Sequence, residues 1–133
     1  PVLLRLKSDL VSHCMAALNN SLNREKVEWE TKKSLGVVMA SGGYPGNYSN
    51  NHPILGLEDI SSKYGHKVFH GGTKFANDRL VTNGGRVLCV TALGDSLEDA
   101  KTSAYELVSK ISWENVQYRT DIGWRAIEKN REN

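Results

Sequence analysis

RVLCVTALGDSLEDAKTSAYELVSKI, residues 86–111, holds the two clearest secondary-structure signals in the chain. Its first part, residues 86–93, is apolar and rich in β-branched side chains, which is typical of a buried strand. From Ser96 to Ile111 the apolar residues instead recur at helical spacing, and Ser96 with Asp99 resembles a capping box. We therefore expect a strand followed by a helix that packs on a sheet. The apolar stripe of this helix consists of Leu97, Ala100, Ala104, Leu107, Val108 and Ile111.

Four further short segments have the composition of strands. Residues 35–40 are apolar and end at a Ser-Gly-Gly sequence, and the others are residues 66–70, 74–75 and 80–82, separated by glycine, asparagine and aspartate. Strands this close in sequence pair most readily as antiparallel neighbours, because parallel pairs need a longer crossover. The predicted fold class is α+β, with an antiparallel sheet, one packed helix and an N-terminal lead-in helix.

The two ends of the chain carry weaker signals. Between residues 8 and 22 apolar residues recur at helical spacing, so we expect a lead-in helix with one buried face, followed by a polar stretch in which Trp29 is a buried anchor. After the main helix we predict a short final strand at residues 113–118, a closing turn at 121–125 and a polar tail at 129–133. The apolar residues of the lead-in helix are Leu10, Val11, Cys14, Leu18 and Leu22.

The overall composition indicates an ordinary globular chain, with 39% apolar and 24% charged residues in 133. The net charge of +2 comes from intermixed basic and acidic residues, so there is no electrostatic footprint of nucleic-acid binding. No apolar run approaches the ~20 residues needed to span a bilayer, and the first residues are not a signal peptide, so we expect a cytoplasmic protein without membrane contact. Cys14 and Cys89 lack the spacing of a metal site; two buried thiols are the simpler interpretation, and a disulfide is the alternative.

Two segments have the composition of anion-binding sites. Residues 70–74 (HGGTK) place an imidazole, a hydroxyl and an ammonium group close together, which suits phosphate, although a histidine at a strand end more often has a structural role. Residues 83–86 (NGGR) form a tight turn that delivers Arg86 to the start of an apolar strand. Its guanidinium either clamps a phosphate or carboxylate of a ligand or pairs with a carboxylate of the chain such as Asp121.

A glycine-rich loop at residues 42–46 offers backbone amides for an anion, and Tyr44 and Tyr48 are rings on which a ligand could stack. Ordinary turn chemistry is the simpler explanation, and the loop lacks the Gly-Lys-Ser/Thr ending of a P-loop. No Ser-His-Asp or Cys-His constellation stands out. The residues alone indicate an α+β domain with candidate anion-binding segments.

Several segments, taken in order, resemble one enzyme family. They are RLKSDL (5–10), VVMASGGYPG (37–46), VFHGGTK (68–74), VTNGGRVL (81–88), AY (104–105) and YRTDIGWRA (118–126). This pattern is similar to the C-terminal part of the glycinamide ribonucleotide synthetases, and it covers nearly the whole chain. The resemblance implies that residues 1–34 are the end of an ATP-grasp core with a linker helix, and that residues 35–133 are a C-terminal α+β domain.

The resemblance also implies an ATP-grasp ligase of de novo purine biosynthesis, which joins glycine to 5-phosphoribosylamine through a glycyl phosphate. ATP and Mg²⁺ (or Mn²⁺) are the implied cofactors. The family binds them with residues upstream of this chain, so we expect the chain alone to be inactive and to have the N-terminal ATP-grasp portion as its partner. Within the chain, the resemblance implies that Lys74 and Arg86 bind the ribose phosphate and that Thr73, Gly84 and Gly85 shape the same pocket.

The chain departs from the family pattern in two places. Gly71 stands where alanine is usual, and Asn50 with Asn51 replaces a common Lys-Gly pair, which removes an anion contact expected from that loop.

Two other functions stay open: a stand-alone binding module for a phosphorylated metabolite, and a structural homodimerisation domain. The missing initiating methionine and the start inside a family motif favour a fragment of the ligase. The sequence does not fix the oligomeric state, or whether the parent enzyme is monofunctional or fused.

Overall fold

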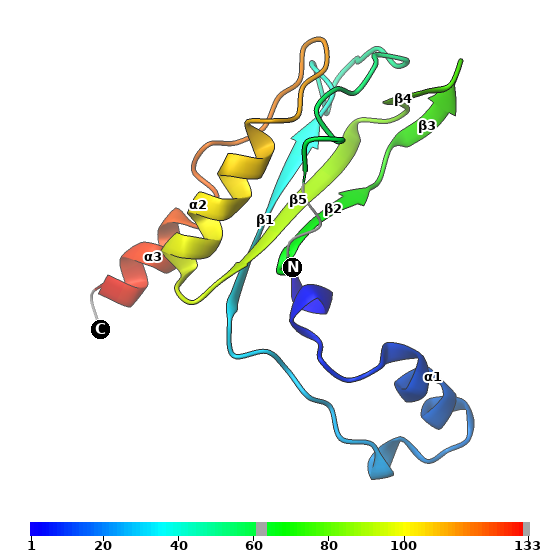
Figure 1. Cartoon of the computed structure of the whole chain (residues 1–133), viewed down its shortest axis with the longest axis vertical. Coiled ribbons are helices and arrows are strands. Elements are labelled where there is room, and N and C mark those ends of the chain that lie inside the picture. The colour runs from blue at the N-terminus through cyan, green and yellow to red at the C-terminus, as the bar shows by residue number, and fades with distance from the viewer. Residues whose placement is uncertain (61–63, 132–133) are drawn as a thin grey trace.

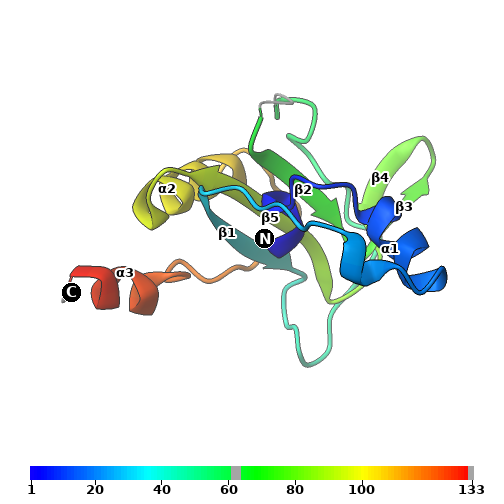
Figure 2. The ribbon, with the colours of Figure 1, turned by 90° about the horizontal axis from the view of Figure 1, so that it is seen from below.

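A computed structural model describes residues 1–60 and 64–131 of the chain (Figure 1). Three antiparallel strands, in the order β1-β5-β2, form its main sheet. They are β1 (Lys33–Ala40), β5 (Arg86–Gly94) and β2 (His66–His70). The helix α2 (Leu97–Val108) lies along the β1–β5 pair, as Figures 1 and 2 show. The predicted α+β class, the packed helix and the five strands predicted between residues 35 and 93 are confirmed.

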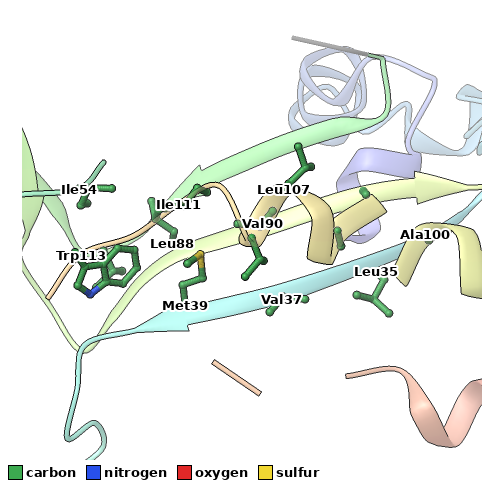
Figure 3. Close-up of a cluster of buried hydrophobic side chains, with 14 residues drawn as sticks. Leu35, Val37, Met39, Ile54, Leu88, Val90, Ala100, Leu107, Ile111 and Trp113 are labelled. Atoms are coloured by element: carbon green, nitrogen blue, oxygen red, sulfur yellow. The ribbon is translucent and has the colours of Figure 1, made fainter. Parts of the chain in front are cut away.

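The core lies between α2 and one face of this sheet. Every second residue of β1 points into it, so that Val37 and Met39 are fully buried while Val38 between them is 42% exposed. Ser96 caps α2 as predicted, because its hydroxyl accepts from the Asp99 amide while the Asp99 carboxylate accepts from the Ser96 amide. The core residues labelled in Figure 3 are Leu35, Val37, Met39, Ile54, Leu88, Val90, Ala100, Leu107, Ile111 and Trp113.

A separate two-stranded ribbon, made of β3 (Thr73–Ala76) and β4 (Arg79–Thr82), projects from the main sheet (Figure 1). Its two-residue turn is Asn77-Asp78, and both residues have a positive φ, as a tight hairpin turn requires. Residues 51–54 run along the other side of β4, where the Ile54 amide donates to the Leu80 carbonyl oxygen at 2.9 Å. The ribbon and this segment thus run side by side as two strands and one extended segment.

The N-terminal 30 residues form a closed excursion that begins against the sheet, where Pro1 lies next to Gly36 of β1, and then runs away from it (Figures 1 and 2). It contains the 3-10 turns η1 (Val2–Arg5) and η2 (Leu22–Arg24) and the helix α1 (Leu10–Leu18). Backbone hydrogen bonds between residues 5–7 and 28–30 close it, with the Glu30 amide 2.7 Å from the Arg5 carbonyl oxygen.

The predicted helix exists, but its predicted buried face is wrong. Ala16 is the only buried residue of α1. The apolar residues predicted to be buried are exposed or half-exposed: Leu10, Val11, Cys14, Leu18 and Leu22. Trp29 is likewise 46% exposed rather than a buried anchor. The physical reason is that α1 stands apart from the main sheet and α2, so none of the core elements that the structure describes covers it.

Cys14 and Cys89 are both free, and Cys14 is exposed. The prediction of two buried thiols is therefore wrong: Cys14 lies on the uncovered helix α1, and Cys89 is only partly buried.

The C-terminal prediction also needs correction. Residues 113–118 form no strand; their one bridge joins Gln117 to Ala40. The residue before this segment, Ser112, bridges to Leu55. The expected turn at 121–125 leads into the helix α3 (Trp124–Arg131), which takes in most of the segment predicted to be a polar tail. Ile127 is buried and anchors this otherwise polar helix. Residues 132 and 133 lie outside the described residues.

Candidate functional site

The turn before β5 is clamped by a buried serine. Ser41, which is 2% exposed, donates its hydroxyl to the Gly84 carbonyl oxygen at 2.8 Å, and its amide donates to the Gly85 carbonyl oxygen at 2.8 Å. A Cβ atom at Gly85 would overlap the ring of Tyr44. These contacts hold the predicted NGGR turn against the glycine-rich loop. They also fix the backbone position from which the Arg86 side chain projects.

On its other side the same turn packs against the glycines of the HGGTK segment. A Cβ atom at Gly72 would lie 2.9 Å from the Gly84 Cα atom, and the Asn83 amide donates to the Gly72 carbonyl oxygen at 2.8 Å. Only residues without a side chain permit this approach of two backbones. The two segments predicted to bind anions are therefore in direct contact at their glycines.

Arg86 lines an open cleft of about 580 Å³ on the sheet face opposite α2. The lining is mostly apolar, and its floor is the outward-facing side of β1. The lining residues are Gly36, Val38, Ala40, Tyr44, Arg86, Gln117, Tyr118, Arg119 and Ile122. A cleft of this size with a few polar groups has the dimensions of a small-molecule site.

Residues 117–122 form one wall of the cleft, and they are hydrogen-bonded to two parts of the chain that are distant in sequence. Gln117 exchanges backbone hydrogen bonds with Ala40, and its side-chain amide donates to the Tyr44 carbonyl oxygen at 2.7 Å. Tyr105, on α2, donates its hydroxyl to the Arg119 carbonyl oxygen at 2.6 Å and accepts from the Ile122 amide at 3.1 Å. The cleft therefore has backbone-anchored walls.

The ion pairs in the cleft exclude one of the predicted partners of Arg86, the carboxylate of Asp121. Asp121 makes a two-point ion pair with Arg119, at 2.9 and 2.6 Å. This bond holds the pKa of the Asp121 carboxyl below its ordinary value and raises the pKa of Arg119. Arg86 makes no ion pair or hydrogen bond through its side chain with any residue that the structure describes. Its guanidinium is exposed and free to meet an anionic ligand.

The other predicted site residues lie on the ribbon. Thr73 starts β3, and its hydroxyl is 3.2 Å from Nδ1 of His70, which gives that histidine a local partner. Lys74 is exposed on β3 and lines neither of the two clefts that contain Arg86. Of the predicted site residues, Arg86 lines the cleft, Gly84 and Gly85 form the turn just before it, and Lys74 lies on a different sheet.

Sequence reasoning did not assign Ser41, Gln117 or Tyr118 to the site. Nothing in the sequence indicated that Gln117 and Tyr118 line a cleft, because their position depends on the bridge between Gln117 and Ala40. These two residues are 77 positions apart, from 40 to 117. Ser41 was visible only as the residue that ends a predicted strand.

Residues 1–60 and 64–131 contain no group of three or more His, Cys, Asp or Glu side chains that could hold a metal ion. No helix within the same residues has the length and apolar character needed to cross a membrane.

Comparisons with known proteins agree on one family. A family model described as "Phosphoribosylglycinamide synthetase, C domain" matches residues 34–125. The chain is 52% identical, over 132 residues and 98% of its length, to phosphoribosylamine–glycine ligase of Escherichia coli (strain K12), and 46% identical, over 99% of its length, to the ligase of Vibrio parahaemolyticus. In both cases it spans 30% of the relative's own length.

A solved structure gives the same result. The crystal structure of phosphoribosylamine–glycine ligase from Thermotoga maritima superimposes with a TM-score of 0.65 at 31% identity, covering 81% of this chain and 27% of that one. The chain belongs to the family of phosphoribosylglycinamide synthetase C domains.

Proposed function

We propose that the chain is the C-terminal part of an ATP-dependent ligase that joins glycine to 5-phosphoribosylamine, giving glycinamide ribonucleotide, ADP and phosphate. The observation that carries this proposal is the 52% identity over 98% of the chain to a protein named phosphoribosylamine–glycine ligase. A carboxylate is a poor electrophile until it is phosphorylated, which is why the joining of glycine to an amine requires ATP.

ATP and Mg²⁺ (or Mn²⁺) belong, in this proposal, to the upstream portion of the ligase. No catalytic step of the ligase reaction is therefore proposed for the residues of this chain. The chain supplies binding contacts, and by itself it should not hydrolyse ATP.

Arg86 is the residue proposed to contact the ribose phosphate of the substrate. It is the unpaired cation of a cleft whose other arginine is bound to Asp121. A planar guanidinium binds two phosphate oxygens at once. Gly84 and Gly85 shape the approach to it, and Thr73 and Lys74 are proposed as further contacts that act from the β3–β4 ribbon.

Residues 1–34 are proposed to complete the upstream ATP-grasp portion, with residues 35–133 as the C-terminal domain. Two observations support this division: the family match begins at residue 34, and β1 begins at Lys33. The excursion formed by the first 30 residues exposes apolar side chains that a neighbouring domain would cover, among them Leu18 at 78% exposure. The others are Val2, Leu3, Leu10, Val11, Met15, Leu22, Val27 and Trp29.

A chimera tests the proposal. The matching 30% of the E. coli ligase is replaced by this chain, and ADP release is measured with and without glycine and phosphoribosylamine. We expect ADP release only when both substrates are present, and none from the chain alone. A folded chimera that releases no ADP, or ADP release by the chain alone, would contradict the proposal.

A further inference from the structure

A serine, a histidine and a glutamate lie in successive contact outside the cleft of Arg86. The Ser49 hydroxyl is 2.7 Å from Nε2 of His52, and the other ring nitrogen, Nδ1, is 3.1 Å from the Glu114 carboxylate. Ser49 and His52 are close in sequence, whereas Glu114 comes from the segment after α2. None of the three lines the cleft. The fold thus brings together a nucleophile, a base and a carboxylate.

The backbone of His52 is fixed to the ribbon. Its amide donates to the Thr82 hydroxyl at 3.1 Å, and its carbonyl oxygen accepts from the Thr82 amide at 2.9 Å. Thr82 is fully buried, and the His52 side chain is 17% exposed. Ser49 is exposed, so its hydroxyl is open to small molecules in solution. A positioned imidazole therefore faces an accessible hydroxyl.

The carboxylate of Glu114 determines how the imidazole of His52 can act. A carboxylate beside Nδ1 favours the tautomer with its proton on Nδ1, which leaves Nε2 free to accept from the Ser49 hydroxyl. When Nε2 takes that proton, the ring becomes a cation, and the negative charge of Glu114 stabilises it. These are the three roles through which a serine is activated: nucleophile, general base and orienting carboxylate.

We propose that Ser49 is an activated nucleophile that accepts an acyl group from small activated esters. Its Oγ attacks the carbonyl carbon, its proton passes to Nε2 of His52, and the carbon–oxygen bond to the leaving phenolate breaks. Water then releases the acyl group as a carboxylic acid, with the His52 proton passing to solvent. The amides of Ser49 and Asn50 donate to no atom of residues 1–60 and 64–131, so both are available to the oxyanion. This reaction is independent of the proposed ligase function.

A second set of the same residue types provides a matched comparison. The Ser8 hydroxyl is also 2.7 Å from Nε2 of a histidine, His13, but Nδ1 of His13 is 3.7 Å from the Glu25 carboxylate and makes no hydrogen bond to any residue that the structure describes. Ser8 is half-buried, and its hydroxyl already accepts from the Glu28 amide at 3.1 Å. We therefore expect Ser8 to be unreactive.

The test is acetylation of the chain by p-nitrophenyl acetate, with peptide mapping by mass spectrometry to locate acetyl esters that hydroxylamine removes. We expect the ester on Ser49 to form about 100-fold faster than on Ser109, an exposed serine without a base, which is the lower end of the contribution of a general base. His52→Gln should lower the rate at Ser49 to that at Ser109. Glu114→Gln should slow it about 10-fold, because the carboxylate is exposed and screened by water, whereas Glu114→Asp, which keeps the charge, should retain most of the rate.

Ser8→Ala is the matched control and should leave acetylation of Ser49 unchanged. Ser49→Ala should remove the label without changing the Tm, since Ser49 is exposed. The proposal is overturned if Ser49 is acetylated no faster than Ser109, if Ser8 is labelled as fast as Ser49, or if His52→Gln leaves the rate unchanged.

Discussion

Replacing Ser41 by alanine removes the hydroxyl that clamps the turn before β5. Ser41 is 2% exposed, and its hydroxyl lies 2.8 Å from the Gly84 carbonyl oxygen. A lost hydrogen bond of this kind costs about 1 kcal/mol, and an unpaired buried partner raises the cost to about 1–3 kcal/mol. Gly84 is half-buried, so water reaches part of its carbonyl group, and we expect a loss of about 1–1.5 kcal/mol. For a chain of this length that corresponds to a fall in Tm of roughly 3–6 °C.

Urea unfolding followed by circular dichroism measures this loss. The matched control is Ser109→Ala, because Ser109 also donates its hydroxyl to a carbonyl oxygen, that of Glu106 at 2.9 Å, but is exposed. The control should change the free energy of unfolding by less than about 0.5 kcal/mol. If Ser41→Ala costs no more than Ser109→Ala at the same m-value, the clamp does not stabilise the turn and the reasoning is refuted.

Gly85→Ala places a Cβ atom in the ring of Tyr44 and should lower the free energy of unfolding by about 1–3 kcal/mol in urea titrations; an unchanged midpoint would mean that the ring is free to move away. The Ser96 hydroxyl lowers the pKa of Asp99 in the folded chain. The stabilisation that ionised Asp99 gives to the cap of α2 is therefore complete above the unfolded pKa of about 3.9 and is lost as the pH falls through the folded pKa. Asp99→Asn should weaken the pH dependence of the free energy of unfolding at acid pH, and an unchanged dependence would refute the capping contribution. Leu18→Lys should leave the stability of the isolated chain within about 0.5 kcal/mol but destabilise the chimeric ligase, whereas equal effects in both would argue against docking of the N-terminal residues.

The strands and the main helix could be predicted because their signals are local. Apolar alternation, glycine-rich turns and the Ser96–Asp99 capping box all lie within a few residues of the element that they define. The buried face of α1 could not be predicted, since helical periodicity shows that a face is apolar but not what covers it. A final strand at residues 113–118 was expected from composition, but a strand needs a partner along its length, and Gln117 pairs with Ala40 alone.

The candidate site also has features that the sequence predicts and features that it does not. The NGGR turn that delivers Arg86 was visible in the sequence, and so were the glycines that pack against it. The cleft itself was not, because Tyr44 and Gln117 reach it from segments distant in sequence. Residue type also suggested that Lys74 and Arg86 act together, whereas the strand pairing places Lys74 beside Arg79 on the ribbon. Which cations share a site depends on register, and the sequence does not determine register by itself.

The most direct test of the account is the KM for phosphoribosylamine of the chimeric ligase, with and without Arg86→Gln. The account predicts an active chimera in which Arg86→Gln raises this KM by about 10–100-fold, because a charge-assisted contact to phosphate is lost, while the KM values for glycine and ATP stay within about 2-fold. Lys110→Gln, which removes an exposed cation at the end of α2, serves as the charge-matched control. An active chimera in which Arg86→Gln leaves the KM for phosphoribosylamine unchanged would contradict the assignment of the cleft.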